Sequence, residues 1–314
     1  MPGADERSPQ PARRARRVGD AENAAGHGLP DELLAAQRPA ALLRALGVSA
    51  RRGLGQHFLT SLGPVRRAIA AAELGPDDTV LEVGPGLGIL TQALLPIARR
   101  VVAVELDRAL AERLAAWRAQ APQLEVIHGD ILALDLCQLF SHRGYKVVAN
   151  LPYNVAAPTL RHLLESPCQP SRLVVMLQQE MAERIVAAPG ALSILGVGVQ
   201  LYAAPRIVAK VPPGAFYPPP KVMSAIVRLE VRPQPALPVP ARTFFALVRA
   251  GFSLPRKQLR NSLAAGLARE PRAVAEALAA AGIDSRRRPQ TLSLPEWGEL
   301  YVEAQRRHLV MSDE

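Results

Sequence analysis

Four consecutive residues, Asn150-Leu151-Pro152-Tyr153, combine a carboxamide, a proline turn and an aromatic ring directly after an apolar strand pattern. The exocyclic amine of a nucleobase is a poor nucleophile, because its lone pair is delocalised into the ring. Acceptors on its two hydrogens favour a pyramidal nitrogen, and the Asn150 side-chain oxygen and the Leu151 carbonyl suit that role. Pro152 stiffens the turn, and Tyr153 offers a face on which a base can stack. The motif indicates group transfer to such an amine, driven mainly by positioning.

A glycine-rich turn precedes this corner in the chain. Gly84, Gly86 and Gly88 lie between an apolar strand pattern and a helical one, where the backbone can approach a ligand closely. Glu105 ends the next strand, 21 residues after Gly84, where a carboxylate can accept hydrogen bonds from both ribose hydroxyls. Asp130 ends the strand after that. Acids at successive strand ends predict a nucleoside-containing cofactor, and the spacing alone does not separate a nicotinamide cofactor from S-adenosylmethionine.

The elements that position these residues alternate in the way typical of a parallel α/β sheet. Strands are expected at residues 79–83, 100–106, 124–129, 146–150 and 172–178. Helices are expected at residues 31–46, 88–97, 107–117, 156–165 and 179–188. Two later strand patterns, 206–211 and 221–231, are joined by a proline-rich loop and predict an antiparallel hairpin at one edge of the sheet.

The proline-rich segment 232–241 marks a boundary, beyond which the pattern is entirely helical. Helices are expected at 242–252, 256–268, 271–281 and 295–308. Ser293 and Glu296 have the spacing of a capping box at the start of the last one. The predicted organisation is a disordered tail over 1–28, a cofactor-binding domain over 29–233 and a helical domain over 234–314.

The net charge of +10 is concentrated in the last third, where residues 201–314 hold 17 Lys and Arg against 9 Asp and Glu. A localised excess indicates a surface that faces a polyanion, whereas an evenly Arg-rich composition would only aid solubility. Arg249, Arg256, Lys257 and Arg260 form one cluster, in which Arg256 and Arg260 would share a face of the helix expected at 256–268. We expect these four to contact nucleic-acid phosphates without reading bases.

Composition also narrows the class of protein. No apolar run reaches the roughly 18 residues that a membrane-spanning helix requires, and the N-terminus has no apolar segment typical of a secretory signal. The two cysteines, Cys137 and Cys168, are too few for a disulfide framework or a zinc site. We therefore expect a reducing compartment, the cytoplasm, with no metal and no membrane partner.

Together the motifs resemble the ribosomal RNA adenine N6-dimethyltransferase family, most closely its bacterial small-subunit (16S) type. The resemblance runs from about residue 42 to about residue 305 through GLGQHFL, VLEVGPGLGILT, VVAVELD, GDIL, NLPYN, FYPPPKV, FSLPRKQLRNSL and RPQTLSLPEW. It implies a class I (Rossmann-like) methyltransferase sheet with a small all-helical C-terminal domain and S-adenosylmethionine as donor. The implied reaction places two methyl groups on N6 of each of two adjacent adenosines near the 3′ end of small-subunit RNA. The implied substrate is a pre-assembled small subunit, and the enzyme is expected to be monomeric.

The resemblance also implies roles for individual residues. The donor would be contacted by His57, Leu59, Gly84, Glu105, Asp130 and Asn150. Glu105 would hold the ribose and Asp130 the adenine amine of the donor. Asn150 and Tyr153 would meet the target base, and Phe216 would close on its other face. The family usually has Asn where this chain has His57, so this one contact departs from the pattern.

Three other interpretations stay open at this point. The first is the sister group that methylates large-subunit (23S) RNA and confers macrolide resistance, although FYPPPKV and RPQTLSLPEW favour the small-subunit type. The second is a non-catalytic ribosome-assembly or RNA-binding relative, against which intact Asn150, Tyr153, Gly84 and Glu105 weigh. The third, a β-turn whose asparagine bonds its own backbone, would explain the corner alone but not the cofactor signature before it.

Overall fold

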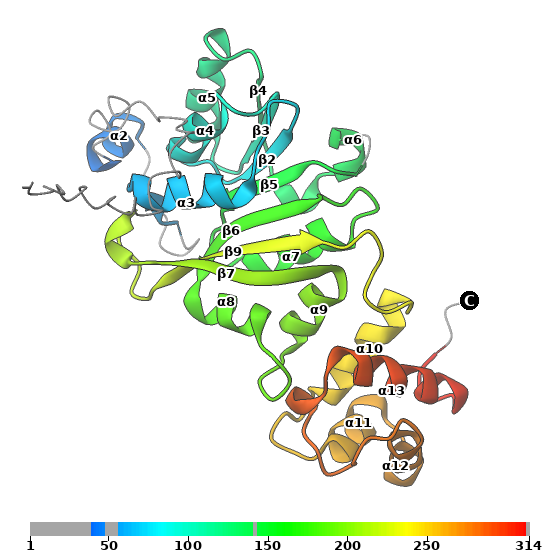
Figure 1. Ribbon diagram of the computed structural model, residues 1–314. Helices are drawn as coiled ribbons and strands as arrows, with labels where there is room; N and C mark the ends of the chain where they lie inside the picture. The colour runs from blue at the N-terminus through cyan, green and yellow to red at the C-terminus, as the bar shows by residue number, and fades with distance from the viewer. Residues whose placement is uncertain (1–38, 48–55, 141–142, 312–314) are drawn as a thin grey trace, which may run out of the picture.

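The structure is a computed structural model that describes residues 39–47, 56–140 and 143–311 (Figure 1). The tail expected over 1–28, and the first part of the helix expected at 31–46, lie outside the described residues. Of that helix the structure describes α2 (Pro39–Ala45). The described residues form a mixed α/β unit around a seven-stranded sheet of order β4-β3-β2-β5-β6-β9-β7, followed by a group of helices.

The five predicted strands of the sheet are all present, and they run parallel to one another. They are β2 (Thr79–Val83), β3 (Arg100–Glu105), β4 (Leu124–His128), β5 (Lys146–Asn150) and β6 (Arg172–Gln178). Successive side chains point to opposite faces of a strand. Val80 and Val148 accordingly join the hydrophobic cluster on one face, whereas Leu81 and Val147 join the cluster on the other.

The predicted edge hairpin is confirmed by β7 (Ala203–Val211) and β9 (Ser224–Val231), which pair antiparallel. Since β9 also pairs antiparallel with β6, β9 runs against the other strands of the sheet. Between them, β8 (Phe216–Tyr217) forms a separate two-stranded sheet with β1 (Phe58–Leu59). This pair was not predicted from the sequence, because a strand of two residues has no periodic pattern.

Helices cover both faces of the sheet (Figure 1). One face carries α3 (Leu62–Ala72), α4 (Ile89–Leu94) and α5 (Arg108–Ala115). The other carries α6 (Leu136–Phe140), α7 (Ala156–Glu165), α8 (Gln179–Val186) and α9 (Ile194–Tyr202). Neither α3 nor α9 was predicted. The β-branched and glycine-rich sequence of α9 disfavours a helix, but a Cβ at Gly196 would lie 2.7 Å from the Arg184 carbonyl, so glycine lets α9 pack closely on α8.

The C-terminal region is helical, as predicted, and consists of α10 (Ala241–Gly251), α11 (Leu259–Leu267), α12 (Pro271–Ala280) and α13 (Leu294–Arg306). The capping box is present at the start of α13, where Ser293 and Glu296 cap each other's backbone N–H groups. Trp297 and Tyr301 of α13 belong to the same hydrophobic cluster as the face of the sheet covered by α7, α8 and α9. The helical group is thus packed onto the α/β unit through α9.

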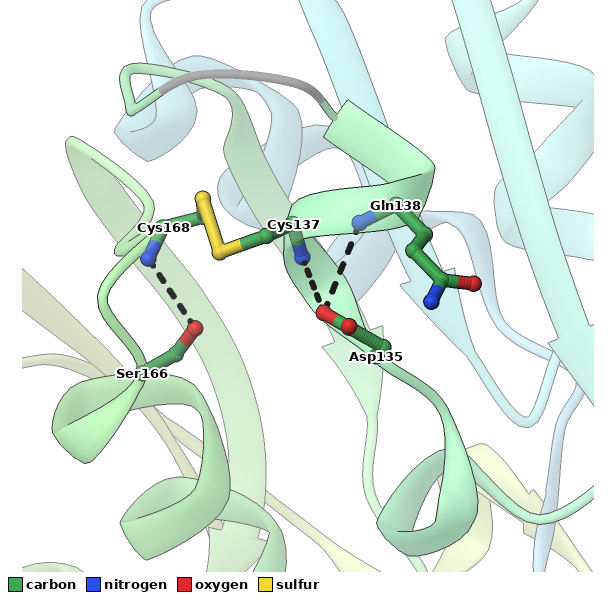
Figure 2. The surroundings of a disulfide bond; sticks show 5 residues. All are labelled: Asp135, Cys137, Gln138, Ser166 and Cys168. Atoms are coloured by element: carbon green, nitrogen blue, oxygen red, sulfur yellow. Dashed lines mark hydrogen bonds between the residues drawn. A yellow bond between two sulfur atoms is a disulfide. The ribbon is translucent and has the colours of Figure 1, made fainter.

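The two cysteines form one disulfide, a pair that was not predicted from the sequence (Figure 2). Cys137 lies in α6 and Cys168 in the turn after α7, with their Cα atoms 5.2 Å apart. The number of cysteines in the sequence does not predict this bond, because the two residues are 31 positions apart. They come together only because α6 packs beside the end of α7.

Candidate active site at the carboxyl edge of the sheet

A hollow opens at the carboxyl ends of β2, β3 and β5, the edge where open parallel sheets bind ligands. It is lined by five of the six residues predicted to contact a donor: His57, Leu59, Gly84, Glu105 and Asn150. These come from four separate stretches of chain, which only the folded sheet brings together. A larger open hollow of about 700 Å³ lies at the opposite edge, between the amino ends of β2, β3 and β4. None of the predicted site residues lines that one.

The glycine turn forms one wall of the hollow. Gly84, Gly86 and Gly88 have φ values of +67°, +57° and +82°, a backbone region that residues with a Cβ disfavour. A Cβ at Gly86 would lie 2.8 Å from a ring carbon of Phe58, and one at Gly88 would lie 2.5 Å from the Trp117 ring. A Cβ at Gly84 would make only an ordinary contact with the Pro152 ring, at 3.7 Å, so at this position only the backbone conformation favours glycine.

Glu105 is held rigidly at the end of β3. Its side chain is 4% exposed, and its two oxygens accept hydrogen bonds from the backbone N–H groups of Gly86 and Asp107, both at 2.9 Å. Burial raises the pKa of Glu105 above its ordinary value, against the opposing effect of these two bonds. Each carboxylate oxygen has a second lone pair, so the group can still accept from a diol such as ribose.

A second acid, Glu82, was not predicted from the sequence and lines the hollow from inside β2. It is 1% exposed, and the Thr91 hydroxyl donates to its Oε2 atom at 2.6 Å. Burial raises the pKa of Glu82 to about 8. The sequence did contain a signal for Glu82, an acidic residue within the apolar strand pattern TVLEV. Burial of a carboxylate costs free energy unless neighbouring groups stabilise it, so such a residue is worth examining as a site residue.

The Asn150 corner borders the same hollow. The carboxamide nitrogen of Asn150 donates to the backbone oxygen of His57 at 2.9 Å, which leaves the carboxamide oxygen as the free end of the group. The Tyr153 hydroxyl lies 2.6 Å from the Ser224 hydroxyl, and burial raises the pKa of Tyr153, so the phenol is neutral at physiological pH. This arrangement has the acceptor and the aromatic face that methylation of a base amine requires.

Tyr153 is not among the residues that line the hollow, and neither are Asp130 and Phe216. Asp130 is exposed and accepts from the Leu132 backbone N–H at 2.9 Å, capping the short 3₁₀ helix Ile131–Ala133. Phe216 is 4% exposed and packs in the hydrophobic cluster that contains Leu59 and Ala215. A base could meet the Phe216 ring only after a local rearrangement, so the roles of these residues stay predictions.

The four basic residues predicted to contact phosphates lie around the junction of α10 and α11. The helix expected at 256–268 begins only at Leu259, so the expectation that Arg256 and Arg260 share one helical face is wrong. Arg256 and Lys257 instead occupy an exposed turn, which is closed when the Lys257 N–H donates to the Leu254 carbonyl at 2.9 Å. Arg249 is exposed on α10, and Arg260 is half-buried in the first turn of α11.

The fold and the site together are those of the Rossmann-like methyltransferases. This class has a sheet of this strand order with one antiparallel strand near its edge, a glycine turn after one strand and a carboxylate at the end of the next. Solved structures agree. A dimethyladenosine transferase from Plasmodium falciparum aligns with a TM-score of 0.71 and 26% identity, over 81% of this chain and 99% of that one. A 23S rRNA methyltransferase, ErmE, aligns with a TM-score of 0.63 and 29% identity, over 79% of this chain and 99% of that one.

Sequence comparison narrows the class to a family. Residues 47–300 match the family described as ribosomal RNA adenine dimethylase. The ribosomal RNA small subunit methyltransferase A of a Dehalococcoides mccartyi strain is 44% identical over 265 residues, which cover 83% of this chain and 91% of the relative. The protein of the same name from Pelotomaculum thermopropionicum is 44% identical over 82% of this chain and 92% of its own length. The chain therefore belongs to the ribosomal RNA adenine dimethylase family.

Proposed function

We propose that this protein is an S-adenosylmethionine-dependent rRNA dimethyltransferase that modifies N6 of two adjacent adenosines near the 3′ end of small-subunit RNA. The observation that carries the proposal is the Asn150 carboxamide, whose nitrogen is bound to the chain and whose oxygen is left to accept from an amine beside the hollow. The relatives that are 44% identical are named for the small subunit, which favours this RNA over the large-subunit RNA of the second structural relative.

The residues present fit the donor. Glu105 presents two anchored oxygens to the ribose diol, and the glycine turn lets a ligand lie against its backbone. Next to Glu105 and Asp130, the exposed side chains of Leu106 and Leu132 offer apolar surface for an adenine ring. When bound, S-adenosylmethionine supplies an electrophilic methyl group on a sulfonium sulfur. His57, Leu59 and Gly84 complete the donor contacts, with Asp130 at the adenine amine.

The chain's own contribution to methyl transfer is to orient the accepting amine. The Asn150 oxygen and the Leu151 carbonyl accept its two hydrogens, which directs the nitrogen lone pair away from them. Tyr153 stacks on the base, and Phe216 closes on the other face once its packing opens. On accepting the methyl group that the bound donor would supply, the nitrogen would become cationic and strongly acidic, and it would lose its proton to water without a general base. Positioning of this kind accounts for most of the rate.

The basic turn serves RNA recognition. Arg256 and Lys257 are exposed where they can reach phosphates, with Arg249 and Arg260 beside them. Such contacts orient a structured RNA, while the target adenosine is unstacked and rotated into the site. We place the reaction in the cytoplasm, on a pre-assembled small subunit, with one copy of the protein acting alone. Within the described ranges, no helix has the length and apolar character needed to span a membrane.

The proposal is tested with labelled S-adenosylmethionine and three substrates: small subunits from a strain lacking the modification, naked 16S RNA and naked 23S RNA. We expect label on the small subunits, and nucleoside mapping should recover N6,N6-dimethyladenosine from two adjacent positions. Label on naked 23S RNA alone would replace the proposal by the large-subunit function. Tight binding to small subunits without any label would replace it by an assembly role without catalysis.

A further inference from the structure

His57 lies between the two motifs that meet the target base. Its backbone oxygen accepts from the Asn150 carboxamide at 2.9 Å, and its ring nitrogen Nδ1 lies 2.7 Å from the carbonyl oxygen of Pro218. The centre of its ring is 5.3 Å from that of Tyr153. One residue therefore contacts both the Asn150-Tyr153 corner and the segment that carries Phe216.

The pairing of β1 with β8 explains why a side chain is needed at this point. Phe58 pairs with Tyr217 and Leu59 with Phe216, so the next step of the antiparallel ladder places His57 opposite Pro218. Proline has no backbone N–H and cannot continue the ladder. The His57 ring instead donates to the Pro218 carbonyl. Since a carbonyl oxygen only accepts, Nδ1 must carry the proton.

The same residue determines which end of the Asn150 carboxamide points away from the chain. If the amide were reversed, its oxygen would face the backbone oxygen of His57, and two acceptors would repel each other. The backbone of His57 thus directs the Asn150 nitrogen inward and leaves the oxygen for the target amine. The position of that backbone depends in turn on the β1–β8 pair and on the ring bond to Pro218.

We propose that His57 is a positioning residue: its ring bond to Pro218 holds the segment 213–223 against the Asn150 corner and thereby keeps the carboxamide aligned for methyl transfer. This role rests on the proposed function and goes beyond the donor contact that the family resemblance assigns to this position. It also gives a physical reason for a histidine there. The imidazole ring of His57 bonds to Pro218 in the facing segment, while the backbone oxygen of His57 accepts from the Asn150 carboxamide.

Two variants of His57 separate positioning from donor binding. His57→Leu keeps bulk but has no donor, whereas His57→Asn can present an amide N–H near the place of Nδ1. We expect His57→Leu to lower kcat on unmethylated small subunits by about tenfold to a hundredfold, as small misplacements of a reacting group do. We expect its affinity for the donor, measured by calorimetry without RNA, to fall by no more than about threefold, because His57 is only one of several groups that line the hollow. His57→Asn should restore most of kcat.

A second readout needs no activity. Hydrogen exchange of the free protein should be faster over 213–223 in His57→Leu than in wild type, and near wild type in His57→Asn. A loss confined to donor affinity, with unchanged exchange over 213–223, would overturn the proposal and return His57 to a donor contact only. If the wild-type protein methylates no small subunit, the proposed function fails, yet the exchange comparison still decides whether His57 holds this segment.

Discussion

The carboxamide nitrogen of Asn150 donates to the backbone oxygen of His57 at 2.9 Å, across 93 residues of sequence. This bond joins the end of β5 to the residue before β1, so the corner proposed to meet the base and the wall of the hollow proposed for the donor are directly connected. It also defines the direction of the amide, and the free oxygen is the group that the proposed reaction uses.

Removing that oxygen tests its role directly. Asn150→Ala should lower kcat by about a hundredfold or more, since an interaction made with the reacting amine is removed where positioning carries the rate. Donor affinity should fall only a few-fold, because Asn150 is one of several groups lining the hollow. Single-turnover methyl transfer and calorimetry of donor binding measure the two quantities separately.

Asn154→Ala is the matched control, because Asn154 is exposed and does not line the hollow. It should leave both quantities within about twofold of wild type, in keeping with the small effects of surface changes. Undiminished turnover in Asn150→Ala would remove the carboxamide from the mechanism.

The buried acid Glu82 should make stability depend on pH. Its folded-state pKa of about 8 lies above the value of 4.5 expected for an exposed group, so the folded protein holds the proton longer than the unfolded chain. The resulting stability is fully present below about pH 4.5 and is lost as pH rises toward 8. Glutamine resembles the protonated acid and does not titrate. The free energy of unfolding of Glu82→Gln should therefore rise relative to that of wild type by up to roughly 5 kcal/mol over that range.

Urea unfolding at a series of pH values from 5 to 8 measures this difference. Glu112→Gln serves as the control, because Glu112 is an exposed carboxyl on α5 and should show no such trend. A constant difference between Glu82→Gln and wild type across the range would show that Glu82 is ionised in the folded protein.

Gly88 of the glycine turn has a matched control in Gly282, which lies after α12. Gly88 and Gly282 have φ values of +82° and +70°, but only at Gly88 would a Cβ meet another residue, 2.5 Å from the Trp117 ring. Gly282→Ala should lower the free energy of unfolding by about 1–2 kcal/mol, because of the backbone conformation alone. Gly88→Ala should cost more by about 1–3 kcal/mol, the range for an overpacked site. Equal losses in thermal unfolding would mean that Trp117 moves aside freely.

The exposed turn between α10 and α11 should contribute electrostatically to RNA binding. Arg256→Glu with Lys257→Glu should weaken binding to small subunits by at least tenfold at about 0.1 M salt. It should also reduce the slope of log K against log salt by about two, one for each phosphate that the variant no longer neutralises. Arg272→Glu reverses a charge that is exposed on α12 and should serve as the control. An equally large weakening in that variant would indicate a general effect of net charge.

The disulfide should stabilise the α6–α7 region. Closing a loop of 31 residues removes entropy from the unfolded chain worth about 3–4 kcal/mol in the loop-entropy account. The oxidised protein should therefore unfold at higher urea than the reduced protein. The double variant Cys137→Ser, Cys168→Ser should match the reduced protein and show no response to reductant. A wild type that is equally stable with and without reductant would contradict this.

Much of the fold and part of the site follow from local patterns. The apolar strands and the glycine turn indicated the parallel sheet and its ligand edge, because strand periodicity and backbone freedom are properties of short segments. Gly84, Glu105 and Asn150 line one hollow for the same reason, since residues at the carboxyl ends of neighbouring parallel strands lie at one edge of the sheet. The capping box at Ser293 was equally predictable, because both partners lie within four residues.

Contacts between segments far apart in the chain depend on how the elements pack. The bond from His57 to Pro218 spans 161 residues, and its two-residue strands have no pattern of their own. Phe216 is buried rather than open because the β1–β8 pair packs it beside Leu59, and α9 is helical because its glycine fits against α8. Local sequence patterns set which chemical groups lie at the ends of the strands. Packing decided which of them touch, because burial free energy is gained between segments that the linear order does not join.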